Sequence, residues 1–215
     1  MARGRSEARV GCCGGRPRAR RSCGDATSFE ACRATKEWQD AGIVDDDFYI
    51  SVNLSARHLQ DQTVVRDVIA ALDASGLPAS SLVLEVTETG LIEDLNPAGS
   101  TLAKLKVLGL RVAVDDFGTG HSSLAYLSSF PIDIIKIDKS FVDQVDVAVE
   151  GERMIRAVID LARTLGLIAI AEGIEREGQA VALRRLGCPL AQGFLLARPM
   201  PAEDMAMSRD HLWVT

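Results

Sequence analysis

Residues 82–88 read Leu-Val-Leu-Glu-Val-Thr-Glu, and this short stretch decides the fold class. Its first residues are apolar without alternation, which is typical of a strand whose two faces are both covered, as in a parallel sheet. Similar runs recur along the chain after residue 47. The six runs are 48–52, 82–86, 111–114, 134–137, 167–171 and 190–192. The sequence therefore predicts six buried strands that lie parallel.

Amphipathic segments separate these strands, and each ends at a glycine, which readily adopts the left-handed conformation that closes a helix. One stripe holds Val65, Val68, Ile69 and Leu72; a second holds Leu102, Leu105 and Leu108; a third holds Met154, Val158, Leu161 and Leu165. The closing glycines are Gly76, Gly109, Gly166 and Gly187. Residues 28–42 predict a further helix ahead of the first strand. This alternation indicates an α/β protein, either a doubly wound sheet or a (β/α)8 barrel.

The length of the chain limits the barrel interpretation. A complete barrel has eight strands and typically about 250 residues, whereas this chain has 215 residues. We therefore expect an incomplete (β/α)8 TIM-type barrel with about six βα units, over residues 28–215.

Residues 1–27 differ in composition from the rest. Residues 1–24 hold seven Arg and one Glu, a net charge of +6, so the remainder carries −12 of the total of −6. They contain three of the five cysteines but no Leu, Ile or Phe, and the cysteine spacing fits no zinc template. We expect residues 1–27 to be a disordered or non-native leader that cannot supply two buried strands. A nucleic-acid-binding arm is the alternative, which the lack of aromatic residues disfavours.

The overall composition excludes several classes of protein. The chain is 47% hydrophobic and 25% charged, as in ordinary globular domains. No uncharged apolar stretch approaches the ~18 residues of a membrane span. Reduced thiols are the default interpretation of the cysteines, so a cytoplasmic location is expected.

Polar residues cluster where the predicted strands end. They are Asn53, Glu85, Glu88, Asp115, Asp116, Lys136, Asp138, Glu172, Glu175 and Gln192. In a parallel barrel, the carboxyl ends of the strands share one rim, and active sites form there. The sequence therefore predicts one polar site built from all six strand ends.

The charges of this rim indicate its chemistry. Six of these carboxylates would face the one lysine, Lys136: Glu85, Glu88, Asp115, Asp116, Glu172 and Glu175. Partly buried like charges stay ionised only when cations join them. Oxygen ligands favour Mg²⁺ or Mn²⁺ over zinc, and two such ions can activate water and neutralise a phosphate. Two enzyme classes remain open on this basis: metal-dependent phosphodiester hydrolysis, and proton abstraction next to a carboxylate.

The order of the motifs favours the first class. Val-Asn-Leu-Ser (52–55), Glu-Val-Thr-Glu (85–88), Asp-Asp-Phe-Gly-Thr-Gly (115–120), Lys-Ile-Asp (136–138), Glu-Gly-Ile-Glu (172–175) and Gln-Gly-Phe (192–194) follow one another. Together they resemble the EAL domain family of cyclic di-GMP phosphodiesterases, which act in bacterial second-messenger signalling. The resemblance implies a (β/α)8 barrel that uses Mg²⁺ or Mn²⁺ to hydrolyse cyclic di-GMP to linear pGpG. It also implies a possible homodimer, and no nucleic-acid polymer as partner.

The resemblance implies a role for each motif residue. Asn53, Glu85, Asp115 and Asp116 resemble the metal ligands, and Lys136 and Glu172 resemble the lysine that holds the attacking water and the general base. Glu88 resembles the glutamate that anchors the loop after the Asp pair. Glu175, Gln192 and Asp138 resemble supporting residues.

The chain departs from the family at its start. The Glu-Ala-Leu motif, whose glutamate is a metal ligand, is absent, as is the arginine that follows it and helps to bind substrate. Glu30-Ala31 resembles the helix before the Val-Asn-Leu-Ser strand instead. The chain thus resembles an EAL domain that lacks its first strands. The alternative to an enzyme is a non-catalytic cyclic di-GMP receptor or a protein-interaction module.

Overall fold

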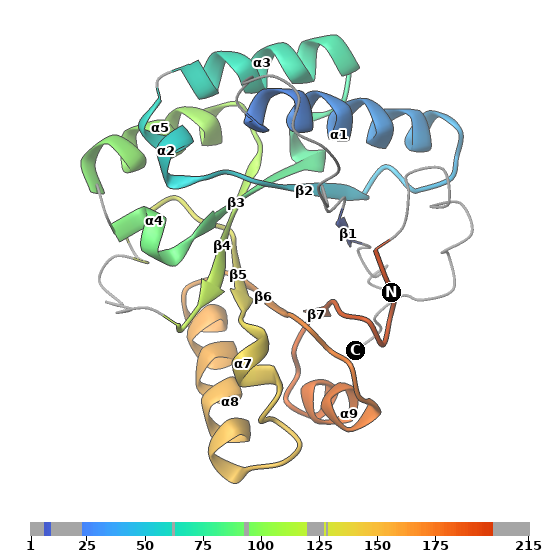
Figure 1. The fold of residues 1–215 in the computed structure, drawn as a ribbon, viewed down its shortest axis with the longest axis vertical. Coiled ribbons are helices and arrows are strands. Elements are labelled where there is room, and N and C mark those ends of the chain that lie inside the picture. Colours follow the sequence, from blue (N-terminus) through green and yellow to red (C-terminus); the bar gives the residue numbers. More distant parts are fainter. Residues whose placement is uncertain are drawn as a thin grey trace.

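The sheet of this protein is parallel throughout. The structure is a computed structural model and describes residues 7–9, 23–61, 63–92, 95–119, 127 and 129–199. The strands of the described residues are β1 (Glu7–Arg9), β2 (Tyr49–Asn53), β3 (Leu82–Thr87), β4 (Arg111–Phe117), β5 (Ile134–Ile137), β6 (Ile168–Ala171) and β7 (Leu190–Ala191). They form one sheet in sequence order, and each pairs in parallel with the next. The six predicted strands are confirmed, and the curved sheet with outer helices is an incomplete TIM-type barrel (Figure 1).

Helices connect consecutive strands and cover the outer face of the sheet (Figure 1). They are α1 (Cys23–Asp40), α2 (Ala56–Gln60), α3 (Thr63–Ser75), α4 (Glu88–Ile92), α5 (Leu95–Val107), α7 (Lys139–Val142), α8 (Val149–Thr164) and α9 (Glu177–Arg185). The four predicted closing glycines all have positive φ, between 69° and 93°. Among the described residues, no helix has both the length and the apolar character needed to cross a membrane.

The buried face of α8 differs from the predicted stripe. Met154 and Leu165 are 48% and 36% exposed, whereas Ile155 and Ile159 are buried beside Val158. Both Met154 and Ile155 have helical spacing to Val158, so periodicity cannot choose between them. Packing against the sheet selects the face that includes Ile155.

The N-terminal segment also departs from expectation. Helix α1 begins at Cys23, five residues before the predicted start, and Glu7–Arg9 forms strand β1, where no strand was expected. Strand β1 pairs with β2 from Glu7 opposite Tyr49 to Arg9 opposite Ser51. Backbone groups make this ladder, so it needs no apolar side chains, and it satisfies an edge that β2 would otherwise expose. Residues 1–6 and 10–22 of the predicted leader lie outside the described residues, and the division of the chain at residue 27 stays a prediction.

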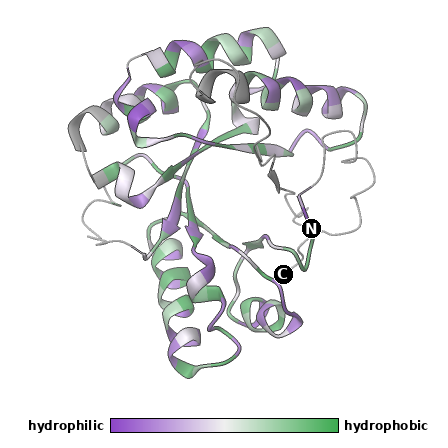
Figure 2. Ribbon diagram, in the orientation of Figure 1, coloured by the Kyte–Doolittle hydropathy of each residue, from purple (hydrophilic) through white to green (hydrophobic). Residues whose placement is uncertain are grey.

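Both faces of the sheet are covered, as the uninterrupted apolar runs predict. The outward side chains, such as Leu84, Val114 and Ile135, join a large core with the helices. The inward side chains form a separate cluster of Tyr49, Val83, Ala113, Ile134 and Ile170, each at most 1% exposed. Strand β4 turns hydrophilic toward its carboxyl end (Figure 2). The barrel interior is therefore an apolar layer that gives way to polar residues at one rim.

Truncation of a core valine tests the packing. Val112 of β4 is fully buried, whereas Val107 at the end of α5 is 87% exposed. We expect Val112→Ala to lower the free energy of unfolding by about 2 kcal/mol, because two methyl groups leave the core and a cavity remains. The matched Val107→Ala variant should stay within about 0.5 kcal/mol of wild type in urea unfolding. Equal effects of the two changes would contradict the assignment of the core.

Candidate active site

The charged residues of the rim form a layer directly above the apolar interior. Each follows an inward-facing apolar residue of its own strand by two positions: Glu85 after Val83, Asp115 after Ala113, Lys136 after Ile134 and Glu172 after Ile170. Side chains two apart on a strand point to the same face, so these four groups face the barrel interior. The strand register continues the layer, since Asn53 of β2 lies opposite Glu85 of β3.

A buried lysine holds this layer together. The Nζ atom of Lys136 lies 2.6 Å from Oε1 of Glu85 and 3.2 Å from Oδ1 of Asp115, and it also pairs with Oε1 of Glu172. The lysine is fully buried, and the three carboxylates come from three different strand ends. One ammonium offsets one of three carboxylate charges, so the cluster keeps an excess of negative charge that suits a bound cation.

A second arrangement of carboxylates adjoins the first. Asp115, Asp116 and Glu172 each offer an oxygen within 4.8 Å of the others. Adjacent strand residues normally point to opposite faces, but the register of β4 with β5 shifts between Val114 and Phe117, and Asp116 has φ +55°. This irregularity explains how both aspartates reach the same ion-sized space. Positive φ at a residue other than glycine is uncommon and clusters at functional sites.

Gln192 fixes the orientation of Glu172. Its Nε2 donates a 2.6 Å hydrogen bond to Oε1 of Glu172, the oxygen that also pairs with Lys136. The side chain of Glu172 is only 10% exposed. Two donors on one oxygen, in a site with little water, hold this carboxylate in one orientation.

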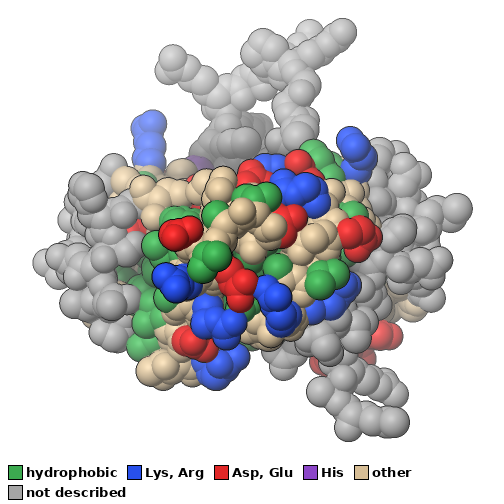
Figure 3. All heavy atoms as spheres, turned by 90° about the horizontal axis from the view of Figure 1, so that it is seen from below, with side chains coloured by type: hydrophobic (Ala, Val, Ile, Leu, Met, Phe, Trp, Pro, Cys, Tyr) green, Lys and Arg blue, Asp and Glu red, His purple; other side chains and the backbone are tan. Residues whose placement is uncertain are grey.

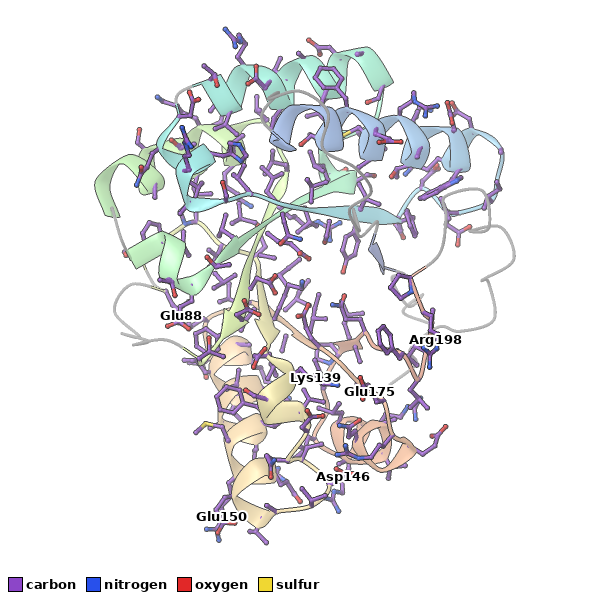
Figure 4. The ribbon with its side chains drawn as sticks, viewed as in Figure 1. Glu88, Lys139, Asp146, Glu150, Glu175 and Arg198 are labelled. Atoms are coloured by element: carbon purple, nitrogen blue, oxygen red, sulfur yellow. The ribbon has the colours of Figure 1, made fainter. Side chains whose placement is uncertain are left out.

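Glu88 anchors the loop after the Asp pair, the position that the resemblance implies for it. Its Oε2 accepts a 2.9 Å hydrogen bond from the backbone N–H of Gly118. Glu88 is the first residue of α4 and is buried, on the β4 side of the site (Figure 4). The continuation of the loop, residues 120–126, lies outside the described residues.

Three of the predicted residues lie apart from the lysine cluster. The side chain of Asn53 is exposed, although its backbone pairs with Glu85. Asp138 caps helix α7, because its Oδ1 accepts a 3.0 Å hydrogen bond from the N–H of Ser140. Glu175 pairs with Lys139 at 2.5 Å.

Several rim residues escaped the sequence reasoning. Lys139, the first residue of α7, lies beside Glu175 of the loop that follows Glu172 (Figure 4). Its hydrogen bond to Glu175 holds the pKa of the Glu175 carboxyl below the ordinary value. The guanidinium of Arg198 lies 5.2 Å from the ring centre of Phe194, which is 52% exposed. Lys139 begins the short helix α7, and Phe194 and Arg198 follow strand β7, so no periodicity marks them. Closeness in sequence to Asp138 and Gln192 was the available signal.

A curved parallel sheet with a carboxylate and lysine layer at its carboxyl ends defines a barrel-type α/β protein with a rim site. The sequence model of the EAL domain matches residues 26–199. The chain belongs to the EAL domain family.

Curated relatives support this membership. The chain is 42% identical over 179 residues to the bifunctional diguanylate cyclase/cyclic di-GMP phosphodiesterase MucR of Pseudomonas aeruginosa, an alignment that covers 83% of this chain and 26% of MucR. It is 40% identical over 175 residues to the signaling protein YkoW of Bacillus subtilis, covering 81% of this chain and 22% of YkoW. The chain thus spans about a quarter of the length of these relatives.

Solved structures share the fold. A structure described as the PaMucR phosphodiesterase in a c-di-GMP complex superposes with a TM-score of 0.80 at 41% identity, covering 85% of this chain and 73% of that chain. The EAL domain of Mycobacterium smegmatis DcpA superposes with a TM-score of 0.83 at 36% identity, covering 89% and 86%.

Removal of the central lysine tests the electrostatics of the site. We expect Lys136→Met to lower the free energy of unfolding by about 3 kcal/mol or more, because it leaves Glu85, Asp115 and Glu172 buried without their cation. Lys106→Met is the matched control, since Lys106 is half-buried and pairs with a single carboxylate, Asp133. Its cost should be about 1 kcal/mol or less. Denaturant unfolding of both variants measures these losses in the free energy of unfolding. Equal losses would count against a special role for Lys136.

The ion pair between Lys139 and Glu175 gives a prediction on pH. The pKa of Glu175 is depressed in the folded protein, so the pair contributes stability above the ordinary carboxyl range and loses it as the pH falls through the folded pKa. Lys139→Met should therefore raise the titration midpoint of Glu175 toward the ordinary glutamate value. NMR titration of the side-chain carboxyl measures this shift, and an unchanged midpoint would contradict the pairing.

Proposed function

We propose that this chain binds cyclic di-GMP at the rim and hydrolyses one of its phosphodiester bonds to give linear pGpG, with Mg²⁺ or Mn²⁺ as cofactor. The observation that carries the proposal is the buried Lys136 among Glu85, Asp115 and Glu172, beside the cluster of Asp115, Asp116 and Glu172. Membership of the EAL family and the name of the MucR relative support the substrate. We place this activity in the bacterial cytoplasm, and a homodimer stays a prediction.

The donor set suits a hard divalent cation. The ligands that we propose, Asp115, Asp116, Glu85 and Asn53, offer only oxygen atoms at the rim, as Mg²⁺ and Mn²⁺ prefer. The excess negative charge around Lys136 provides the electrostatic reason for cations to bind. Bound ions of this kind lower the pKa of water and offset the charge of a phosphate.

The remaining residues divide the chemistry among them. Glu172 takes the proton of the attacking water as general base, and Gln192 keeps its carboxylate oriented for this transfer. Lys136 holds the water and offsets charge that develops on the phosphate. Glu88 fixes the start of the loop after the Asp pair through Gly118, which keeps Asp115 and Asp116 in place.

Strand β1 favours a second candidate, a non-catalytic cyclic di-GMP receptor. Residues 7–9 read Glu-Ala-Arg, but Glu7 lies opposite Tyr49, a residue of the apolar inner layer. Asn53 is four residues further along β2, or about 13 Å at ~3.3 Å per residue. In this register the backbone of Glu7 lies below the level of Asn53. The family's first-strand metal ligand then has no equivalent in β1, which would weaken catalysis more than binding.

Product analysis tests the enzyme proposal. We expect the chain, incubated with cyclic di-GMP and Mn²⁺, to form pGpG that is separated by chromatography. Glu172→Gln should lower the rate by about 10²- to 10⁴-fold, because the general base is lost while the shape of the side chain stays. Glu150→Gln is the matched control; Glu150 is an exposed residue of α8, and the rate should not change (Figure 4).

Calorimetry separates the two candidates. Cyclic di-GMP binding without product formation would overturn the enzyme proposal and support the receptor. Absence of both binding and product would overturn the two candidates together.

A further inference from the structure

Helix α7 lies between the two loops that carry the site. Gly118, in the loop after the Asp pair, has φ +97°, and a Cβ atom there would come within 2.7 Å of the ring of Phe141. Gly173, directly after Glu172, has φ +72°, and a Cβ atom there would come within 2.6 Å of Cγ of Lys139. Phe141 and Lys139 both belong to α7. Each loop therefore approaches a side chain of α7 so closely that a residue larger than glycine would force the loop or that side chain to shift.

Gln179 fastens the second loop to the end of α7. This residue of α9 is fully buried. Its Oε1 accepts hydrogen bonds from the backbone N–H groups of Glu175 and Arg176, both at 2.8 Å. Its Nε2 donates to the carbonyl of Val142 at 3.3 Å and to Oδ1 of Asp143 at 3.1 Å. A primary amide has two acceptor sites and two donors, and here all four are used.

Arg176 makes a second connection between the same segments. Its guanidinium donates to Oδ1 of Asp146 at 2.6 Å and to the carbonyl of Asp143 at 2.9 Å. Its side chain is 44% exposed, so this connection is weaker than the buried one. Asp146 and Glu175 lie on the same side of the molecule, between α7 and α9 (Figure 4).

The loop that carries Glu172 is thus fixed at both ends. At its start, the N–H of Glu172 donates to the carbonyl of Ile137 at 3.1 Å, which continues the pairing of β6 with β5. At its end, three and four residues later, Gln179 holds the amides of Glu175 and Arg176. Loss of the second attachment would free the loop to shift against Lys136 without unfolding the barrel.

We propose that Gln179 is a positioning residue for the hydrolysis. It holds the loop of residues 172–176 against α7, so that the Glu172 carboxylate keeps its place beside Lys136 and Gln192. This inference rests on the proposed phosphodiesterase function. A displacement of about 1 Å at a catalytic group can cost about 10²-fold in rate, so the effect should fall on kcat.

The test compares Gln179→Met with a matched change elsewhere. Methionine has a similar length but none of the four hydrogen bonds. Gln39→Met is the control, because Gln39 of α1 also donates a side-chain hydrogen bond, to Oγ of Ser81 at 3.3 Å, but on another helix. With cyclic di-GMP and Mn²⁺, we expect Gln179→Met to lower kcat by 10- to 100-fold with KM within about threefold, and Gln39→Met to leave both unchanged.

Hydrogen exchange gives a readout that does not depend on turnover. In the absence of substrate, the amides of Glu175 and Arg176 should exchange at least tenfold faster in Gln179→Met than in wild type, while amides of β3 and β4 keep their protection. Arg176→Met is a milder variant, because it keeps the buried side-chain amide of Gln179. It should lower kcat only a few-fold. It also keeps the proposal testable if Gln179→Met does not fold.

The outcomes separate the inference from the proposed function. Wild-type kcat and amide protection in Gln179→Met would overturn the positioning role, as would a loss of kcat in Arg176→Met without faster exchange at residues 175 and 176. A wild-type chain that makes no product would overturn the hydrolysis and any role of Gln179 in it. The exchange rates would still decide whether Gln179 holds the loop.

Discussion

The buried ammonium group of Lys136 is the interaction on which the rim depends. Carboxylates from the ends of β3, β4 and β6 converge on it, and burying such groups together is costly unless a cation lies beside them. The lysine depends equally on the carboxylates, since a buried ammonium group is tolerated only when carboxylates lie beside it. The strand register therefore has to bring four charged groups to one level, and the parallel sheet does this.

The parts around this cluster serve to keep it in place. An apolar layer lies below the cluster. Glu88 holds the loop after the Asp pair, and Gln192 holds the Glu172 carboxylate. Helix α7 lies between this loop and the loop that follows Glu172. Elsewhere the described residues include local ion pairs, such as that of Arg185 of α9 with Glu152 of α8 at 2.6 Å. The face seen from below mixes basic and acidic side chains (Figure 3). At the rim, by contrast, one buried ammonium faces three carboxylates, which leaves negative charge for bound cations to offset.

Much of this architecture could be predicted from the sequence. The apolar runs identify six strands, because a sheet covered on both faces leaves no polar alternation, and the glycines mark where the helices end. The candidate residues were found at the strand ends because parallel strands present these ends at one rim. From the start of α4, Glu88 accepts a hydrogen bond from the loop after the Asp pair. The prediction of which face α8 buries was wrong, because Met154 and Ile155 fit the helical period equally well.

The sequence by itself determined the order of six strands and of the helices between them, and it identified the family, because these follow from local periodicity and short motifs. Only the tertiary structure decided which groups touch. The sharing of Lys136 among three carboxylates, the turn of Asp116 toward Glu172, and the four hydrogen bonds of Gln179 join segments up to 56 residues apart in the sequence. Strand β1 is another feature that only the tertiary structure decided, since its backbone pairs with β2 and its side chains gave no signal in the sequence. Such contacts depend on register and packing, which no single segment encodes.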